Sequence, residues 1–512
     1  MKLHFITLLV LICLIISCEN TDQQQADAQE KPNVIFILAD DLGYGDVNTL
    51  NPDSRIPTPN MDRLALEGMT FTDAHSGSGV CTPTRYGVVT GRYAWRTRLK
   101  RGVLVGYSKH LINPERTTVA DVFKKAGYNT ACIGKWHLGM DMPLLEGTEK
   151  KLHKLDTDQP IQNSPVEYGF DYFYGISASL DFPPYVYMEN DRFTAATTDS
   201  LPKTNFPGYA RAGERAPDFD LVESLDVITA KAVDFIDENE RNPFFLYLPL
   251  TAPHKPVMPH ERFRGNTSLG PYGDFVTQVD WTVGQVLNKL DQLGIADQTL
   301  VIFTSDNGSF MKRIGEDSNF PEGTIGHMQD ETVQAFDPDN HRANYTFRGT
   351  KADIWEGGHH VPFLVRWPGV VQQQSKNDRT ICLTDFFSTA AEITGHQQDR
   401  ASEGEDSFSF LPLMKEGDGY SRESVIHHSS GGMFAIRKGK WKLVLGNGSG
   451  GRQAPRGKAF EEPYQLFDMV EDGIESKDIA AENPTVVEEL LKDFEEIYGR
   501  TEGTIDFKVD SK

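Results

Sequence analysis

Two short clusters of acidic and amide side chains follow long apolar runs of the sequence. Asp40 and Asp41 come directly after one such run, and Asp306 and Asn307 come directly after another. Continuous apolar runs are typical of buried parallel strands, and ligands bind where such strands end. Three carboxylates and one amide oxygen form a hard ligand set that suits Ca²⁺ or Mg²⁺. The alternative is ordinary turn chemistry, because Asp and Asn are common after strands.

A second candidate site is the segment Cys81-Thr82-Pro83-Thr84-Arg85. We expect a helix to begin here, with Thr82 as its N-cap and Pro83 at its first position. Cys81 would then lie at the helix N-terminus, where free N–H groups and the helix dipole favour an anion, and Arg85 can point to the same place. Taken alone, the segment is compatible with a reactive thiol of low pKa or with a buried, inert cysteine.

The segment around Cys81 resembles the signature of the type I sulfatases, a family of the alkaline phosphatase superfamily. The similarity lies in Cys81-x-Pro83-x-Arg85 followed by the sequence TGR at residues 90–92, and it extends over about residues 33–369. The other segments of the family pattern occur in the family's order: Asp40-Asp41, Gly134-Lys135-Trp136-His137-Leu138-Gly139, Ala252-Pro253-His254, Asp306-Asn307-Gly308, and Arg348-Gly349-Thr350-Lys351 with Glu356-Gly357-Gly358.

The resemblance implies two cofactors and one partner enzyme. A separate maturation enzyme, either a formylglycine-generating enzyme or an anaerobic sulfatase-maturating enzyme, would oxidise Cys81 to formylglycine. A Ca²⁺ ion would be held by residue 81 together with Asp40, Asp41, Asp306 and Asn307. These residue types agree with the oxygen ligands that calcium prefers.

The resemblance also implies a mechanism for the hydrolysis of sulfate esters. The formylglycine aldehyde hydrates to a gem-diol, which Ca²⁺, Arg85 and Lys135 hold and help to deprotonate. The resulting oxygen attacks sulfur in line, while Lys351 and His254 neutralise the sulfate oxygens and deliver a proton to the leaving group. His137 then removes a proton from the second hydroxyl of the covalent sulfo-enzyme intermediate, and sulfate is expelled.

The substrate is less visible in the sequence. The segment 81–85 with Arg92-Tyr93-Ala94-Trp95-Arg96 resembles bacterial sulfatases of polysaccharide-degrading systems, which implies a sulfated carbohydrate of algal or glycosaminoglycan type. Asp181, in a polar and aromatic loop, could bind a sugar hydroxyl. Further candidates at the pocket rim are His327, His427, His359, His360 and His428, and for each of them a structural role is an equal alternative.

Two other functions remain open at this point. A phosphodiesterase or phosphonate-ester hydrolase of the same superfamily would use a similar site. A surface lipoprotein that binds sulfated glycans without turnover would keep Cys81 as an unmodified thiol. Comparison of aryl sulfate with aryl phosphate turnover, and the mass of residue 81, would separate these functions.

The elements that must position these residues alternate between strands and helices. This order predicts an α/β fold with a large, mostly parallel central sheet flanked by helices, as in alkaline phosphatase. We expect a catalytic domain over residues 31–416 and a smaller α+β C-terminal domain over residues 417–512 with a short antiparallel sheet. The main strands are expected at residues 34–38, 130–133, 244–248, 300–303 and 361–366, and the main helices at residues 118–126, 225–238, 275–293 and 384–393.

The N-terminus indicates export. Residues 1–17 fit a signal peptide, and residues 15–18 resemble a lipobox that would lipidate Cys18 and leave residues 18–30 as a tether. We therefore expect an exported protein of the periplasm or cell surface, anchored at the outer membrane only through lipid. The net charge of −23 disfavours a nucleic-acid partner. A disulfide between Cys132 and Cys382 is an open possibility.

Overall fold

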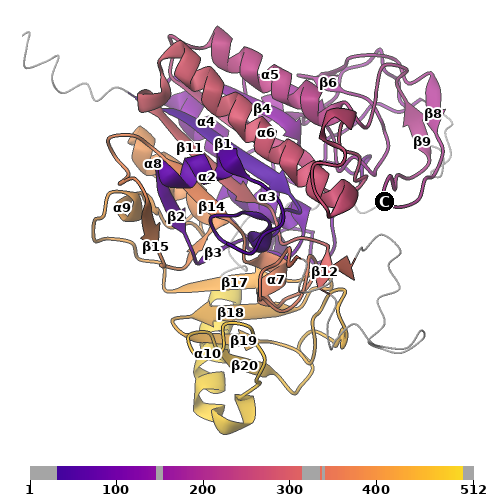
Figure 1. Cartoon of the computed structure of the whole chain (residues 1–512). Coiled ribbons are helices and arrows are strands. Elements are labelled where there is room, and N and C mark those ends of the chain that lie inside the picture. Colours follow the sequence, from indigo (N-terminus) through magenta and orange to yellow (C-terminus); the bar gives the residue numbers. More distant parts are fainter. Residues whose placement is uncertain (1–30, 146–153, 314–334, 337–340, 500–512) are drawn as a thin grey trace, which may run out of the picture.

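A ten-stranded sheet forms the centre of the molecule (Figure 1). The computed structural model describes residues 31–145, 154–313, 335–336 and 341–499. In spatial order the strands are β15 (Ser375–Asn377), β2 (Met69–Phe71), β14 (Phe363–Arg366), β11 (Thr299–Ser305), β1 (Asn33–Asp40), β10 (Phe244–Pro253), β4 (Asn129–Lys135), β5 (Tyr172–Ile176), β6 (Met188–Glu189) and β7 (Arg192–Phe193).

The five middle strands, β11-β1-β10-β4-β5, are all parallel. The flanking strands β14 and β6 run antiparallel to their inner neighbours. Every residue of β1, β10 and β11 is buried, as their unbroken apolar sequences predict for strands covered on both faces. The prediction of a mostly parallel α/β sheet is confirmed.

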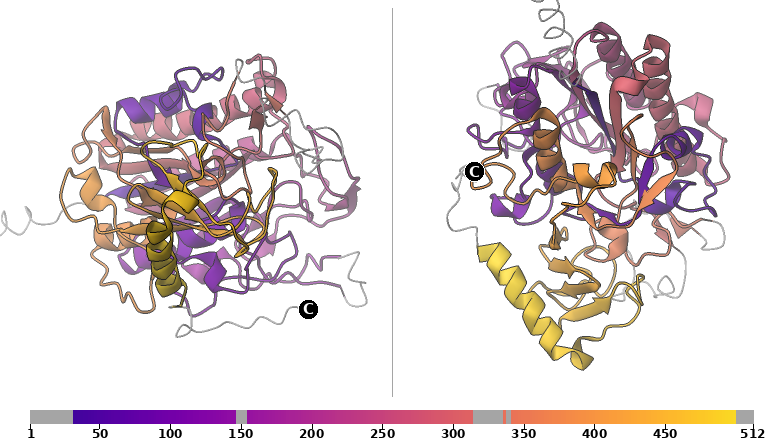
Figure 2. Two further views of the ribbon diagram at one scale, coloured as in Figure 1. Left: turned by 90° about the horizontal axis from the view of Figure 1, so that it is seen from below. Right: turned by 90° about the vertical axis from the view of Figure 1, so that its left-hand side faces the viewer.

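Helices cover both faces of the sheet, and alternate residues of β1 pack against each layer. Ile35 and Ile37 belong to one core, which α2 (Pro59–Leu66), α5 (Ser224–Glu238) and α6 (Gly270–Leu293) complete. Val34, Phe36 and Leu38 belong to the other, which α3 (Cys81–Thr90), α4 (Val119–Lys125) and α8 (Phe386–Thr394) complete. The right-hand view of Figure 2 shows the sheet between these two layers.

A separate four-stranded antiparallel sheet lies at one end of the molecule (Figures 1 and 2). Its strands are β17 (Ser424–His428), β18 (Phe434–Lys438), β19 (Trp441–Val444) and β20 (Gln465–Asp468), and helix α10 (Pro484–Gly499) packs on it through Leu490 and Phe494. The expected short antiparallel sheet of the C-terminal part is confirmed. The division between residues 416 and 417 stays a prediction.

The remaining expectations concern a disulfide between Cys132 and Cys382 and an anchor at the N-terminus. Cys132 and Cys382 are both buried free thiols, so the possible disulfide between them is not formed. None of the described helices combines the length and the apolar character that a membrane crossing requires. The expected signal peptide, Cys18 and the tether lie outside the described residues.

The aromatic packing beneath the sheet predicts a large loss of stability on truncation. Phe386 of α8 is fully buried, and its ring centroid lies 4.4 Å from that of Phe36 and 5.8 Å from that of Phe245. We expect Phe386→Ala to lower the free energy of unfolding by about 3–5 kcal/mol, because it removes burial and leaves a cavity. Urea denaturation followed by tryptophan fluorescence measures this. The exposed Val470→Ala is the control, and equal midpoints for both variants would contradict the assigned core.

Candidate active site

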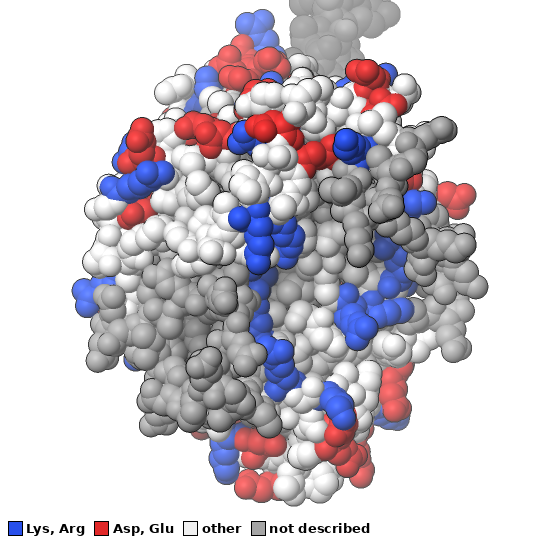
Figure 3. All heavy atoms as spheres, turned by 90° about the vertical axis from the view of Figure 1, so that its right-hand side faces the viewer, with Lys and Arg blue, Asp and Glu red and all other residues white. Residues whose placement is uncertain are grey.

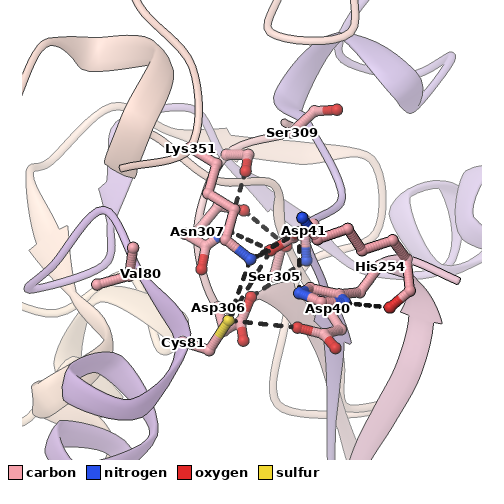
Figure 4. A network of polar contacts seen from close by, with 12 residues as sticks. Asp40, Asp41, Val80, Cys81, His254, Ser305, Asp306, Asn307, Ser309 and Lys351 are labelled. Atoms are coloured by element: carbon pink, nitrogen blue, oxygen red, sulfur yellow. Dashed lines mark hydrogen bonds and ion pairs between the residues drawn. The ribbon is translucent and has the colours of Figure 1, made fainter. Parts of the chain in front are cut away.

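The ends of adjacent parallel strands bring most of the candidate residues together. β11 is followed by Asp306 and Asn307, β1 ends at Asp40 and is followed by Asp41, β10 is followed by His254, and β4 ends at Lys135 and is followed two residues later by His137. Neighbouring strands are about 4.8 Å apart, so side chains at these ends meet at one edge of the sheet. Figure 4 shows Asp40, Asp41, His254, Asp306 and Asn307 of this group together with Cys81 and Lys351.

Helix α3 begins at Cys81 itself, not after an N-cap at Thr82 as the sequence suggested. The N-cap residue is Val80, and Pro83 lies inside the first turn, where a missing N–H group breaks no helical hydrogen bond. The Thr82 hydroxyl instead accepts a hydrogen bond from the Leu104 N–H at 3.2 Å, which holds a neighbouring loop. The position of Cys81 at the helix N-terminus, which the chemistry needs, is retained.

Two lysines meet the carboxylates of the first strand. The Lys135 ammonium donates to both oxygens of Asp40 at 2.7 and 2.8 Å, and the Lys351 ammonium donates to both oxygens of Asp41 at 2.6 and 2.7 Å. Lys351 also lies 3.3 Å from the Cys81 sulfur. Its contact with Asp41 raises the pKa of Lys351 against the effect of burial, so this lysine stays charged.

Arg85 connects Asp306, the residue that follows β11, to the same group. Its Nε donates to Asp306 at 2.9 Å, its Nη2 lies 2.7 Å from the same carboxylate, and its Nη1 donates to the Lys135 carbonyl at 2.9 Å. The side chains of Arg85 and Asp306 are completely buried. These carboxylates raise the pKa of Arg85 despite burial, so the site keeps a permanent positive charge at its base.

The donor set at this edge fits a calcium ion. The carboxylates of Asp40, Asp41 and Asp306 converge, and the buried Asn307 Oδ1 has no hydrogen-bond partner among the described residues. Burial raises the pKa of Asp40 to about 7, which indicates a carboxylate whose charge the surrounding protein does not fully balance. A hard divalent cation, for which Asp40, Asp41, Asp306 and Asn307 supply oxygens, would provide that balance.

Both histidines present an unprotonated nitrogen to the site. His137 Nε2 lies 2.8 Å from the Leu104 carbonyl and therefore carries its proton there, while the buried Nδ1 has no partner among the described residues. His254 Nδ1 lies 2.5 Å from the Lys255 carbonyl, and its Nε2 lies 3.6 Å from Asp41. Burial and the nearby cations hold the pKa of both rings well below the usual range, so both can accept a proton.

An unmodified Cys81 is a poor nucleophile in these surroundings. The residue is 1% exposed, and its sulfur lies 3.6 Å from Asp40 and 3.9 Å from Asp41. Burial and the neighbouring carboxylates raise the pKa of the thiol to about 12. These surroundings do not favour the reactive thiol of low pKa that a helix N-terminus alone would favour, because burial and the neighbouring carboxylates raise the pKa of the thiol.

The predicted substrate residues are not all at the site. Asp181 follows β5, at the same sheet edge, but it is buried and forms an ion pair with Arg211. His427 is not at a pocket rim: it is fully buried and stacks on His359 with ring centroids 3.7 Å apart. His360 and His428 are also buried, and His327 lies outside the described residues.

Sequence reasoning missed a hydrogen-bonded chain that connects two of the site's loops. The Tyr272 hydroxyl lies 2.6 Å from Asp46 and 2.6 Å from the Ser309 hydroxyl, and the Ser309 carbonyl accepts from the Lys351 N–H at 2.9 Å. Asp46 also accepts from the Gly43 N–H at 2.8 Å, beside Asp41. The acidic residue Asp46 close to Asp41 was the only signal, since Tyr272 lies within a long helix.

Comparison with known proteins gives a family. A sequence model of the family described as Sulfatase matches residues 32–396, which include all of the catalytic and metal-binding candidates. The chain belongs to the sulfatase family. It is therefore a sulfuric ester hydrolase, and the resemblance seen in the sequence is confirmed.

Several sulfatases match over most of their length. An N-acetylgalactosamine-6-O-sulfatase of Bacteroides thetaiotaomicron is 31% identical, covering 96% of this chain and 98% of the relative. The human steryl-sulfatase is 29% identical, covering 81% of this chain and 75% of the relative. A solved structure from a core locus for glycosaminoglycan metabolism in B. thetaiotaomicron is 30% identical with a TM-score of 0.77, covering 92% of this chain and all of that chain.

The chain linking Asp46 to Lys351 predicts a role for Tyr272 in this sulfatase. We expect Tyr272→Phe to destabilise the protein by about 1–3 kcal/mol, because it leaves buried Asp46 and Ser309 short of a partner. We also expect a lower kcat, because the loops of Asp41 and Lys351 lose their common support. Thermal unfolding and steady-state kinetics measure both effects.

A matched control is Tyr128→Phe, since the buried Tyr128 hydroxyl has no hydrogen-bond partner among the described residues. This variant should keep both stability and kcat. If the two variants behaved alike, the support that Tyr272 gives to the site would be disproved.

Proposed function

We propose that this sulfatase hydrolyses sulfate esters of sulfated saccharides, of algal or glycosaminoglycan type, with a formylglycine made from Cys81 and a bound Ca²⁺. The observation that carries the proposal is the position of Cys81. It is the first residue of α3, and the carboxylates of Asp40 and Asp41 and the ammonium of Lys351 surround its sulfur. This is an arrangement in which a thiol is unreactive and an oxygen nucleophile bound to a cation would be stabilised.

Formylglycine supplies a hydroxyl nucleophile with a second hydroxyl to release the product, and Ca²⁺ supplies positive charge for that nucleophile and the sulfate oxygens. The residues that would hold Ca²⁺ are Asp40, Asp41, Asp306 and Asn307, with the side chain of residue 81. Their support is the buried set of oxygens already described, in which the Asn307 oxygen has no other partner among the described residues.

The cations of the site would bind and orient the sulfate group. Lys351 reaches the Cys81 sulfur and stays charged, so it would neutralise a sulfate oxygen next to the nucleophile. Lys135 and Arg85 are both fully buried and would hold the oxygen of the nucleophile in position. Their fixed contacts with Asp40 and Asp306 mean that little rearrangement is needed when negative charge develops.

The histidines would move protons. His254 Nε2 faces the site beside Asp41, so once it has accepted a proton it would, together with Lys351, deliver one to the leaving oxygen. His137 Nδ1 is unpartnered among the described residues, so it would take a proton from residue 81 when sulfate is released. The tautomer of each ring is fixed by a backbone carbonyl, that of Leu104 for His137 and that of Lys255 for His254.

Two of the relatives support a sugar as the substrate. The relative with 31% identity acts on 6-O-sulfated N-acetylgalactosamine, and the solved structure with 30% identity comes from a locus for glycosaminoglycan metabolism. A phosphonate monoester hydrolase of Agrobacterium radiobacter shares the fold, with a TM-score of 0.56 and 16% identity. Comparing kcat/KM on aryl sulfate and aryl phosphonate esters therefore separates a sulfatase from a phosphonate-ester hydrolase.

The proposal includes maturation and export. The maturation enzyme would be a formylglycine-generating or an anaerobic sulfatase-maturating enzyme, because residue 81 is a cysteine. The protein would be exported by residues 1–17 and anchored through Cys18 at the periplasmic or outer surface. The apolar run and lipobox-like residues of the N-terminus support this.

The proposed nucleophile predicts a defined chemical change at residue 81. Peptide mass spectrometry of active protein should find the mass expected when the CH₂SH side chain is replaced by an aldehyde. We expect Cys81→Ala to lower kcat on aryl sulfate on the order of 10³-fold or more. Cys382→Ala, which removes another buried thiol, should retain activity. Full activity with an unmodified Cys81 thiol would overturn the formylglycine proposal, and sulfate binding without turnover would indicate a glycan-binding protein.

The proposed calcium site predicts a metal-dependent stability. EDTA should abolish activity and lower the thermal midpoint, and Ca²⁺ in excess should restore both, because an ion that binds only the folded state stabilises it. Asp306→Asn should lose the calcium-dependent rise of the midpoint. The control Asp274→Asn, in a buried carboxylate bound to the Gly265 and Thr267 N–H groups, should keep it. A midpoint that does not respond to EDTA would contradict the site.

A further inference from the structure

Aromatic and basic side chains form a wall beside both catalytic histidines. The Phe182 ring lies 6.2 Å from the His137 ring, in the loop that follows β5. Lys255 follows His254 in sequence, and its ammonium lies 4.9 Å from the centre of the Tyr209 ring. We call Phe182, Tyr209, Lys255 and Arg211 the cationic wall.

Arg211 is the centre of the cationic wall. Its guanidinium lies 3.9 Å from the centroid of the Phe182 ring and 5.4 Å from that of Tyr209, so it stacks between two aromatic side chains. Such stacking favours Arg because its guanidinium is planar and weakly hydrated. All four side chains of the wall are partly exposed.

Asp181 fixes Arg211 in this position. The Asp181 carboxylate forms an ion pair with Arg211 Nη1, and the Asp181 carbonyl accepts from Nη1 at 3.2 Å and from the Arg211 N–H at 3.1 Å. The side chain of Asp181 is 2% exposed, whereas that of Arg211 is 39% exposed. The hydrogen bonds of the Arg211 side chain to the described residues all involve Nη1, which leaves Nε and Nη2 as a fork that can bind a ligand.

This fork is distinct from the sulfate site. The cations around residue 81, namely Arg85, Lys135 and Lys351, are buried and already engaged with the metal-binding carboxylates. Arg211 and Lys255 are instead partly exposed and contact the aromatic rings of Phe182 and Tyr209. The face on the right of Figure 1, which includes β8 (Asp199–Leu201) and β9 (Gly213–Arg215), carries Lys and Arg side chains along its middle, and acidic side chains lie mainly above and below (Figure 3).

We propose that the cationic wall binds a second oxyanion of the substrate, a carboxylate or sulfate on the sugar next to the sulfated one. The proposal rests on the function proposed above and narrows its substrate to saccharides with at least two acidic groups. A half-exposed guanidinium with two free N–H groups matches the two oxygens of such a group. A chain of net charge −23 would otherwise repel a polyanion at long range.

The test compares three substrates of the formylglycine-bearing enzyme. The first is an aryl sulfate without a second charge, the second a sulfated disaccharide with a neighbouring uronate, and the third a disaccharide with a neighbouring sulfate. We expect Arg211→Gln to raise KM for one or both disaccharides about tenfold or more, and to change kcat/KM for the aryl sulfate less than about twofold. The disaccharide that is affected identifies the oxyanion.

Two further variants make the result specific. Arg211→Lys keeps the charge but loses the fork, so its KM should lie between those of the wild type and Arg211→Gln. Arg215→Gln, on β9 and paired with Asp199, removes the same charge from the same segment and should leave KM for the disaccharides unchanged. Rising salt should increase the wild-type KM for the disaccharides more than that of Arg211→Gln.

The outcomes separate the two proposals. If the wild type hydrolyses aryl sulfate but Arg211→Gln handles every substrate as the wild type does, the cationic wall is disproved and the sulfatase proposal stands. If Arg211→Gln loses activity equally on all three substrates, the residue supports the sulfate site itself and the wall is again disproved. If the wild type turns over no sulfate ester, the proposed function fails first.

Discussion

The compensation of buried charge at one edge of the sheet is the constraint on which this structure depends. Asp40, Asp41 and Asp306 have at most 1% exposure, and desolvation of each carboxylate costs several kcal/mol if nothing compensates it. Two lysines and an arginine contact them at distances of 2.6–2.9 Å, and the cation proposed for this site would complete the compensation. Removal of any single member would leave an unpaired buried charge. The cluster therefore carries the chemistry of the protein, and it is also the part of the fold in which each charged side chain most needs its partner.

The C-terminal sheet helps to hold this cluster in place. The His428 carbonyl of β17 accepts from the Gly79 N–H at 3.0 Å, two residues before Cys81. The Ala352 carbonyl, next to Lys351, accepts from the Ser430 N–H at 3.0 Å. Behind these contacts, buried Lys442 of β19 pairs with Glu356 at 2.9 Å and with Glu475 at 2.7 Å. The small sheet thus fixes the two loops that carry residue 81 and Lys351.

Much of the fold and of the site was predictable because it depends on local patterns. The apolar run before Asp40 and the one before Asp306 defined central strands, and strand ends in a parallel sheet share one edge. Residues whose role depends on distant contacts could not be predicted. Asp46 and Tyr272 lie 226 positions apart, and neither has a pattern that points to the other. The exposed fork of Arg211 exists only because Asp181, itself a candidate, is buried beneath it.

Because successive residues of β1 pack on opposite faces of the sheet, the position of the site depends on the number of residues in this strand. Ile35 and Ile37 pack on one side of the sheet, and Phe36 and Leu38 pack on the other. A single inserted or deleted residue in this strand would exchange the two sets and at the same time move Asp40 out of reach of Lys135. Insertions in the loops at the opposite rim of the sheet can therefore be tolerated. A change in the number of residues within β1 would disrupt the hydrophobic layers and the active site together.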